Sequence, residues 1–472
     1  MKRDPRPISL DRRRTSGPLL RGLLPLLLLA LPATADGPGQ GPPAADGASV
    51  PELGGVPVIQ ESQKLGPSAP VVFHQFGFSA SMDGSVAALG APSGDHRVYV
   101  FKRDQEGPEP WREARLLDSP VVGTDGSFGW AVALEGDTLV VGAISANDPQ
   151  SGIGAAYIYR CDEGGPDNWG LLKRILPSDL GANQAFGSAV AIRGDLIAVG
   201  NRRGIGGGFG QVYVFERDAG GPDNWGEIAI IPSPAASNSF GADALSLSGD
   251  ILAVGALSDD TRDSFAGAVY VFERDRGGPG NWGLAKRLIG SGVGLGDEFG
   301  TSVALQGNEL FAGSPGEDVD PDPNVDFSGG AVYVFQRDAD GPDQWGQTAR
   351  IILENPVPQS QFSSGLAVDG DVMVAGTSSL FGQGFAYIFR RDPLDASRWL
   401  ETLRLLSSDL EGGDRFGAAV GINGSEALVT ARFHNPPDFF NLGAGYIFPH
   451  AQPVFSDGFE SGDLSAWSAS VP

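Results

Sequence analysis

Residues 128–143 read FGWAVALEGDTLVVGA, and this stretch decides the fold because close variants of it recur along the chain. It contains two short runs of apolar and β-branched residues, 129–134 and 138–143, separated by the turn Glu-Gly-Asp at 135–137. Such runs, bounded by turn residues, are typical of antiparallel strands joined in a hairpin. The second run is almost continuously apolar, so we expect a strand that is buried on both faces.

The same unit occurs seven times, and each copy predicts four strands. In the copy quoted above, a third strand at 155–159 and a fourth at 169–176 flank a Gly-Gly-Pro-Asp-Asn turn. The Phe residues that begin the copies are Phe76, Phe128, Phe186, Phe240, Phe299, Phe362 and Phe416. Six copies end in a Trp-containing arm, at Trp111, Trp169, Trp225, Trp282, Trp345 and Trp399. Four antiparallel strands repeated at this period indicate an all-β fold, a seven-bladed β-propeller.

The ends of the repeat region predict how the ring closes. The seventh copy stops near residue 448 without a Trp arm. The segment 59–65 begins 17 residues before Phe76, the same offset that separates Trp111 from Phe128. We therefore expect an N-terminal strand to complete the last blade and to tie the two ends of the ring together.

The regions outside the repeats have distinct compositions. Residues 1–35 combine an Arg cluster, an apolar run and an Ala-Thr-Ala site, which predicts a cleavable signal peptide and export to the cell surface or the medium. Residues 36–55 are rich in Gly, Pro and Ala and indicate a linker before the propeller at 56–450. The tail, 451–472, resembles a short C-terminal segment of exported bacterial proteins, for which we consider a sorting role.

Composition limits the partners. The formal charge is −25, and removal of the first 35 residues makes it about −30, which argues against nucleic acids and anionic membranes. Four His and one Cys leave little material for zinc sites, disulfides or thiol chemistry. The apolar run before residue 35 is too short to span a bilayer, so we expect no transmembrane span in the mature chain.

The Phe-Gly start of each copy, followed by an element such as Gly90-Ala91-Pro92, resembles the FG-GAP repeats of the integrin α-subunit propeller. The resemblance covers residues 56–450 and implies a seven-bladed propeller that engages ligands by loops on one face. It also implies a bacterial protein of the exported type. Many family members carry a calcium loop between strands one and two, but here that connection has shrunk to turns such as 135–137, which cannot wrap a cation.

Two variable loops supply the candidate site residues. The loop of the fifth copy holds the alternating acids Asp318, Asp320, Asp322 and Asp326, which we consider as calcium ligands, although the Gly and Glu of a typical calcium loop are missing. The loop of the seventh copy holds Phe433, His434, Asp438, Phe439 and Phe440, which suit sugar or peptide contact. If these two loops flank the short loop of the sixth copy, they form the two sides of a depression above that loop, where we expect the ligand to bind.

The sequence therefore predicts a secreted or cell-surface binding propeller without catalytic residues. We expect a monomer that binds an extracellular protein or carbohydrate and needs no cofactor, with calcium as the one candidate ion. The alternative is an extracellular carbohydrate-active hydrolase, because 58 acidic residues provide many carboxylate pairs.

Overall fold

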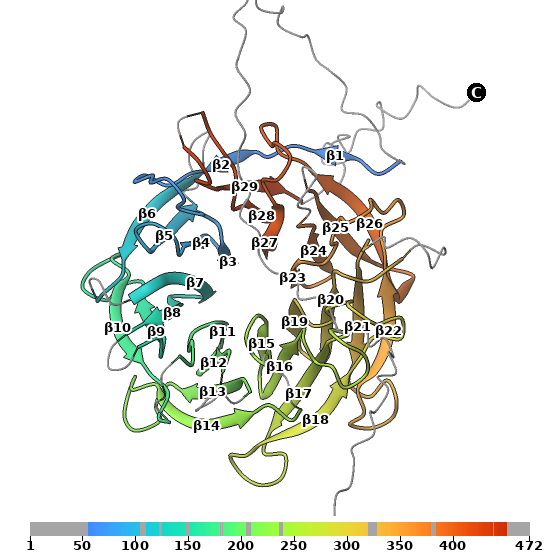
Figure 1. Cartoon of the computed structure of the whole chain (residues 1–472), viewed down its shortest axis with the longest axis horizontal. Coiled ribbons are helices and arrows are strands. Elements are labelled where there is room, and N and C mark those ends of the chain that lie inside the picture. The colour runs from blue at the N-terminus through green and yellow to red at the C-terminus, as the bar shows by residue number, and fades with distance from the viewer. Residues whose placement is uncertain are drawn as a thin grey trace, which may run out of the picture. The chain divides into compact units, whose positions relative to one another are not determined.

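Seven antiparallel sheets stand around a common centre (Figure 1). The computed structural model describes residues 55–450, apart from 104–109, 122–124, 148–150, 180, 182, 204–208, 236–238, 320–327, 379–383 and 438. The predicted signal peptide, most of the linker and the tail lie outside the described residues. The seven sheets confirm the expected all-β propeller.

Within each blade, the strands lie in chain order from the centre of the ring outward. Figure 1 shows the innermost strands of the seven blades nearest the centre: β3, β7, β11, β15, β19, β23 and β27. The strands of the first four blades are β3 Ser79–Asp83, β4 Val86–Ala91, β5 Arg97–Arg103 and β6 Trp111–Asp118; β7 Asp125–Glu135, β8 Thr138–Ala146, β9 Ala155–Arg160 and β10 Gly170–Ile175; β11 Val190–Arg193, β12 Leu196–Asn201, β13 Gln211–Glu216 and β14 Gly226–Pro232; β15 Leu245–Ser248, β16 Ile251–Ala256, β17 Ala268–Arg274 and β18 Trp282–Leu288.

The last three blades follow the same order and take in the N-terminal strands. Their strands are β19 Val303–Gln306, β20 Glu309–Ser314, β21 Ala331–Gln336 and β22 Gly346–Ile351; β23 Gly365–Asp369, β24 Val372–Gly376, β25 Ala386–Asp392 and β26 Asp395–Leu405, with β1 Val58–Ile59; and β27 Phe416–Asn423, β28 Glu426–Ala431 and β29 Ala444–Pro449, with β2 Gln63–Leu65.

The hydrophobic core lies between the blades. Seven buried clusters each combine residues of two consecutive blades, including one that joins the seventh blade to the first. In β4, Ala87 and Leu89 belong to the cluster with the seventh blade, whereas Ala88 belongs to the cluster with the second. Both faces of this strand are therefore buried, as its continuous apolar run predicts.

At five of the seven junctions between blades, a glycine of the second strand meets the glycine of the next Phe-Gly element. Phe128 packs edge-on against Tyr157, with ring centroids 5.6 Å apart. A Cβ atom added to Gly142 of the Gly-Ala element would lie 2.0 Å from the carbonyl oxygen of Gly187, which follows Phe186 in the next blade. The backbones approach so closely that a side chain has no room. This contact explains why the two glycines recur together.

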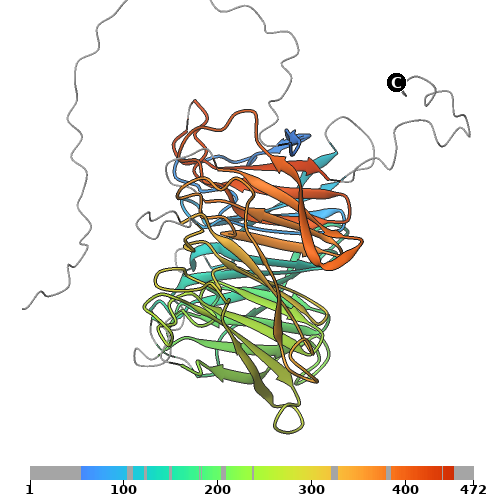
Figure 2. The ribbon, with the colours of Figure 1, turned by 90° about the vertical axis from the view of Figure 1, so that its right-hand side faces the viewer.

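The predicted closure is confirmed and has an additional feature. β2 pairs antiparallel with β29, so the N-terminal segment completes the seventh blade. Only Gln63–Leu65 of the expected strand does so, because β1 instead pairs in parallel with β26 of the sixth blade. Figures 1 and 2 both show these blue N-terminal strands beside the orange and red strands of the last blades. The N-terminal segment thus bridges two blades.

Candidate functional site

The two faces of the ring carry different connections. Because successive strands alternate in direction, the links from the second to the third strand of a blade, and from one blade to the next, emerge on one face. We call it the loop face. The opposite, turn face carries the tight hairpins such as the one at Gly136, whose φ of 56° is the left-handed conformation expected for it.

Exposed apolar side chains gather on the loop face. Seven of the twelve large apolar side chains that are exposed among the described residues lie in its connections: Val72, Phe73, Phe209, Phe265, Leu295, Val357 and Phe440. Leu394 lies in a hairpin of the turn face, and the remaining four lie on or beside outer strands. Phe73 and Phe440 form an edge-to-face pair with centroids 5.3 Å apart, and the Phe73 amide donates to the Phe440 carbonyl. This pair presents exposed apolar surface in one place, which is typical of interaction surfaces.

The central channel opens between these connections as a cavity of about 620 Å³. The inner strands of all seven blades, or the residues just before them, line it with small apolar and hydroxyl side chains. Four larger aromatic or cationic side chains interrupt this lining: Phe78, Trp130, Arg202 and Arg432.

Together with Phe433 and Arg415, these larger side chains form a continuous series of ring and cation–π contacts, which we call the arginine–aromatic ladder. Phe78 and Trp130 lie 4.6 Å apart between ring centroids. The Arg432 guanidinium lies 5.1 Å from the Phe78 ring and 5.2 Å from the Phe433 ring, and Arg415 lies 5.0 Å from Phe433.

At its other end, the Arg202 guanidinium lies 5.4 Å from the Trp130 ring and forms an ion pair of 2.7 Å with Asp243. The ladder thus brings together residues of blades one, two, three and seven. Each such cation–π contact is favourable by about 0.5–1 kcal/mol at an exposed site and more when water is excluded.

Arg415 and Arg432 are electrostatically unusual. Their Nε atoms are buried and donate no hydrogen bond within the described residues. Burial lowers the pKa of both groups, and repulsion from Arg415 contributes to a pKa of about 10 for Arg432. Both guanidinium groups therefore remain charged at neutral pH, and no described carboxylate pairs with either of them.

The candidate ligand residues of the seventh copy separate in the structure. Phe433 belongs to the ladder, while Phe440 is exposed beside Phe73. Phe439 is partly buried in the same loop, and Asp438 lies outside the described residues. Ligand binding by this loop stays a prediction, and its aromatic groups lie toward the first blade and the channel.

His434 turns into the protein and joins a polar network at the ring closure. Its side chain is buried, with Nδ1 3.0 Å from Asp414 and Nε2 2.9 Å from the Nζ atom of Lys64. Lys64 also pairs with Asp409, which accepts a hydrogen bond of 2.9 Å from Tyr446. The hydrogen bonds to Lys64, Ser407 and Tyr446 outweigh burial and lower the pKa of Asp409 to about 2.

Of the candidate calcium ligands, Asp320, Asp322 and Asp326 lie outside the described residues, and only Asp318 is placed. The preceding residue, Glu317, is buried and pairs with Arg350 at 2.6 Å. Calcium binding by this loop stays a prediction.

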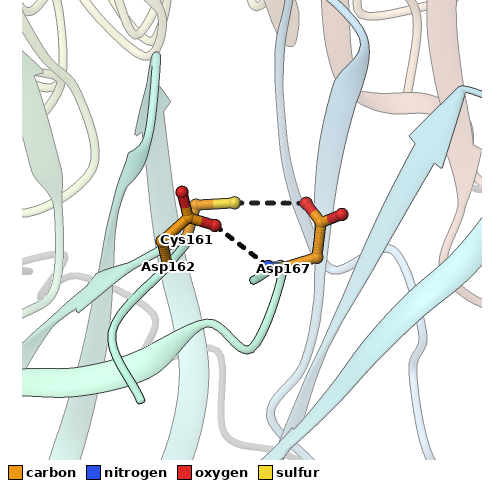
Figure 3. Close-up of side chains that lie close together, drawn as sticks. All are labelled: Cys161, Asp162 and Asp167. Carbon is orange, nitrogen blue, oxygen red and sulfur yellow. Dashed lines mark hydrogen bonds between the residues drawn. The ribbon is translucent and has the colours of Figure 1, made fainter. Parts of the chain in front are cut away.

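One group of possible metal ligands does lie close together among the described residues: Cys161, Asp162 and Asp167 (Figure 3). The Cys161 thiol donates to Asp167 at 3.4 Å, and Lys102 also pairs with Asp167 at 2.6 Å. Burial, followed by the hydrogen bond to Asp167, raises the pKa of Cys161 to about 11. The thiol is therefore protonated at neutral pH as long as no metal ion is bound.

Sequence reasoning missed the ladder, although one signal was visible. Trp130 follows Phe-Gly directly in the second copy, where the other copies have smaller residues or Phe, and it lies outside the Trp arms. The arginines gave no such signal, because Arg202, Arg415 and Arg432 occupy loops that differ from blade to blade.

A family model described as an FG-GAP repeat matches residues 111–159, 169–215, 225–272, 282–335 and 399–448, together just over half of the chain. The chain belongs to the FG-GAP repeat family. Each FG-GAP match begins at the Trp of one outer strand and ends in the third strand of the next blade, so the repeat unit spans a junction between blades. The FG-GAP propeller fold is consistent with a binding role.

No curated protein sequence matches this FG-GAP chain. Among solved structures, a chain of the "Crystal Structure of Mitotic Checkpoint Complex" is similar with a TM-score of 0.51 and 12% identity, over 86% of this chain and 96% of that chain. At this identity the likeness concerns the fold alone. Within the described residues there is no helix with the length and apolar character needed to cross a membrane.

Proposed function

We propose that this FG-GAP propeller is an exported, non-catalytic binding protein that engages an extracellular protein through its loop face. The supporting observation is the unequal distribution of exposed apolar side chains, seven in the loop-face connections against Leu394 on the turn face. A rigid ring that presents variable loops on one side is a common arrangement for binding. The paired rings of Phe73 and Phe440 favour a protein partner over a sugar, because they meet edge to face and offer no flat platform.

The hydrolase alternative has little support in the channel. Glycoside hydrolysis uses two carboxyl groups on opposite sides of the substrate bond. Among the described residues that line the cavity, Asp243 is the single carboxylate, and it pairs with Arg202. A binding role requires no such pair.

Site-specific photocross-linking tests this proposal. Phe440 on the loop face and Leu394 on the turn face, which is 95% exposed, are each replaced by benzoylphenylalanine in the organism that carries this chain. After irradiation and recovery of the exported fraction, we expect covalent adducts with another protein from position 440 and none from position 394. Equal adducts from the two positions, or none from either, would contradict binding through the loop face.

A further inference from the structure

The arginine–aromatic ladder contains positive charges that no carboxylate neutralises within the part of the chain that the structure describes. The chain has 58 acidic residues and a formal charge of −25, yet none of its described carboxylates pairs with Arg415 or Arg432. The two guanidinium groups lie 5.0 and 5.2 Å from the centre of the same ring, that of Phe433, and their like charges repel each other. Keeping unpaired like charges partly buried costs stability, and an anionic ligand would relieve that cost.

The polar groups of the channel mouth also suit an anion. Arg432 lines the cavity directly, and the lining residue Ser188 is only 4% exposed, with a hydroxyl that has no hydrogen-bond partner. Asp243 is the one carboxylate among the described lining residues, and Arg202 neutralises it. Among the described residues, the mouth therefore has one guanidinium without a carboxylate partner and, just beneath its lining, one buried hydroxyl without a hydrogen-bond partner.

The aromatic rings beside Arg432 indicate which chemical group lies next to the negative charge of the ligand. Phe78 and Phe433 lie within about 5 Å of the guanidinium, and Trp130 contacts Phe78, so apolar rings lie next to the charge. A guanidinium group matches the planar, two-oxygen geometry of a carboxylate. A carboxylate next to an apolar group fits this combination.

We propose that the mouth of the central channel binds a carboxylate of the partner, either an acidic side chain or a free C-terminus, which lies next to an apolar side chain. Arg432 is the principal binding residue, Arg415 adds to the positive potential, and Phe78 and Phe433 contact the apolar group. The inference rests on the proposed binding function and names the chemistry that the loop face recognises.

The test uses two small molecules that differ in one charge, N-acetyl-phenylalanine and its neutral amide. Their binding to the mature protein is measured by isothermal titration calorimetry at concentrations up to about 10 mM. We expect the carboxylate to bind at least about tenfold more tightly than the amide, since a charge-assisted hydrogen bond is stronger than a neutral one. Equal affinities, or no binding of the carboxylate, would overturn the proposal.

Variants assign the binding to the ladder. Arg432→Gln is expected to lose the preference for the carboxylate, and Arg415→Gln to reduce it. Arg398→Gln makes the same chemical change on the turn face, at a side chain that is 66% exposed, and should keep the full preference. A preference that survives in the Arg432→Gln variant would contradict the site. The titration needs no partner, so its outcome is independent of the cross-linking result.

Discussion

At the scale of single residues, Asp297 combines burial with negative neighbours. The residue lies in the connection between the fourth and fifth blades and is 7% exposed. Burial raises the pKa of its carboxyl group to about 6, although the Gly294 amide donates a hydrogen bond to it. The charges of Glu317 and Asp318 raise the pKa further, while Arg262 opposes them.

The raised pKa of Asp297 predicts a pH dependence of stability. The folded state binds this proton more tightly than the unfolded chain does, so the contribution is fully present below about pH 4 and is lost as the pH rises through about 6. The Asp297→Asn variant is expected to be more stable than the wild type at pH 7.5 by roughly 2 kcal/mol and nearly equal to it at pH 4. Urea denaturation at both values measures this, and an equal difference at the two would contradict the prediction.

Also at the scale of single residues, the sequence predicted the burial of residues that recur from copy to copy better than the role of residues that occur in one copy. The six Trp of the arms and the seven Phe recur at fixed places, and the structure buries all of them as expected. His434 had no counterpart in other copies, and its partners Asp414 and Lys64 are distant in the chain. The contact with Lys64 depends on the ring closure, and Asp414 lies 20 positions earlier, before β27, so a single loop read alone could not show that this side chain turns inward.

At the scale of elements, the contact between Gly142 in β8 and Gly187 predicts how the blades respond to substitution. Gly142→Ala places a methyl group 2.0 Å from a backbone oxygen, so the second and third blades must separate locally. We expect a loss of roughly 2–4 kcal/mol in the free energy of unfolding, comparable to other forms of core overpacking and strain. Denaturant unfolding followed by Trp fluorescence measures it.

A matched control comes from Gly424, which lies in a turn of the seventh blade. A Cβ atom there meets nothing within 4 Å, and its φ is not in the left-handed region. Gly424→Ala should therefore change the stability by less than about 1 kcal/mol. A similar loss in both variants would mean that the close approach between the blades is not what makes Gly142 necessary.

At the scale of the whole molecule, the ring depends on a short segment at its N-terminus. β2 supplies the outer strand of the seventh blade, and its Leu65 is 2% exposed in the cluster that joins this blade to the first. β1 adds to the sixth blade by two residues, and Ile59 packs against the cluster between the sixth and seventh blades. The missing Trp arm of the seventh copy, and the 17 residues that separate the N-terminal segment from Phe76, predicted this closure. The parallel pairing of β1 had no equivalent in the other copies and could not be predicted.

Two truncations separate these contributions, each made in the mature protein. Removal of residues 56–59 deletes β1, and removal of residues 56–66 also deletes β2. The second deletion exposes the edge of β29 and the buried surface around Leu65, and it removes Lys64 from Asp409 and His434. We expect the longer deletion to lower the melting temperature of the whole ring in one cooperative transition, because every blade is held by its two neighbours. The shorter deletion should have a clearly smaller effect, since it removes two residue pairs at an outer edge. Equal melting temperatures for the wild type and the longer deletion would show that the ring is stable without its N-terminal strand.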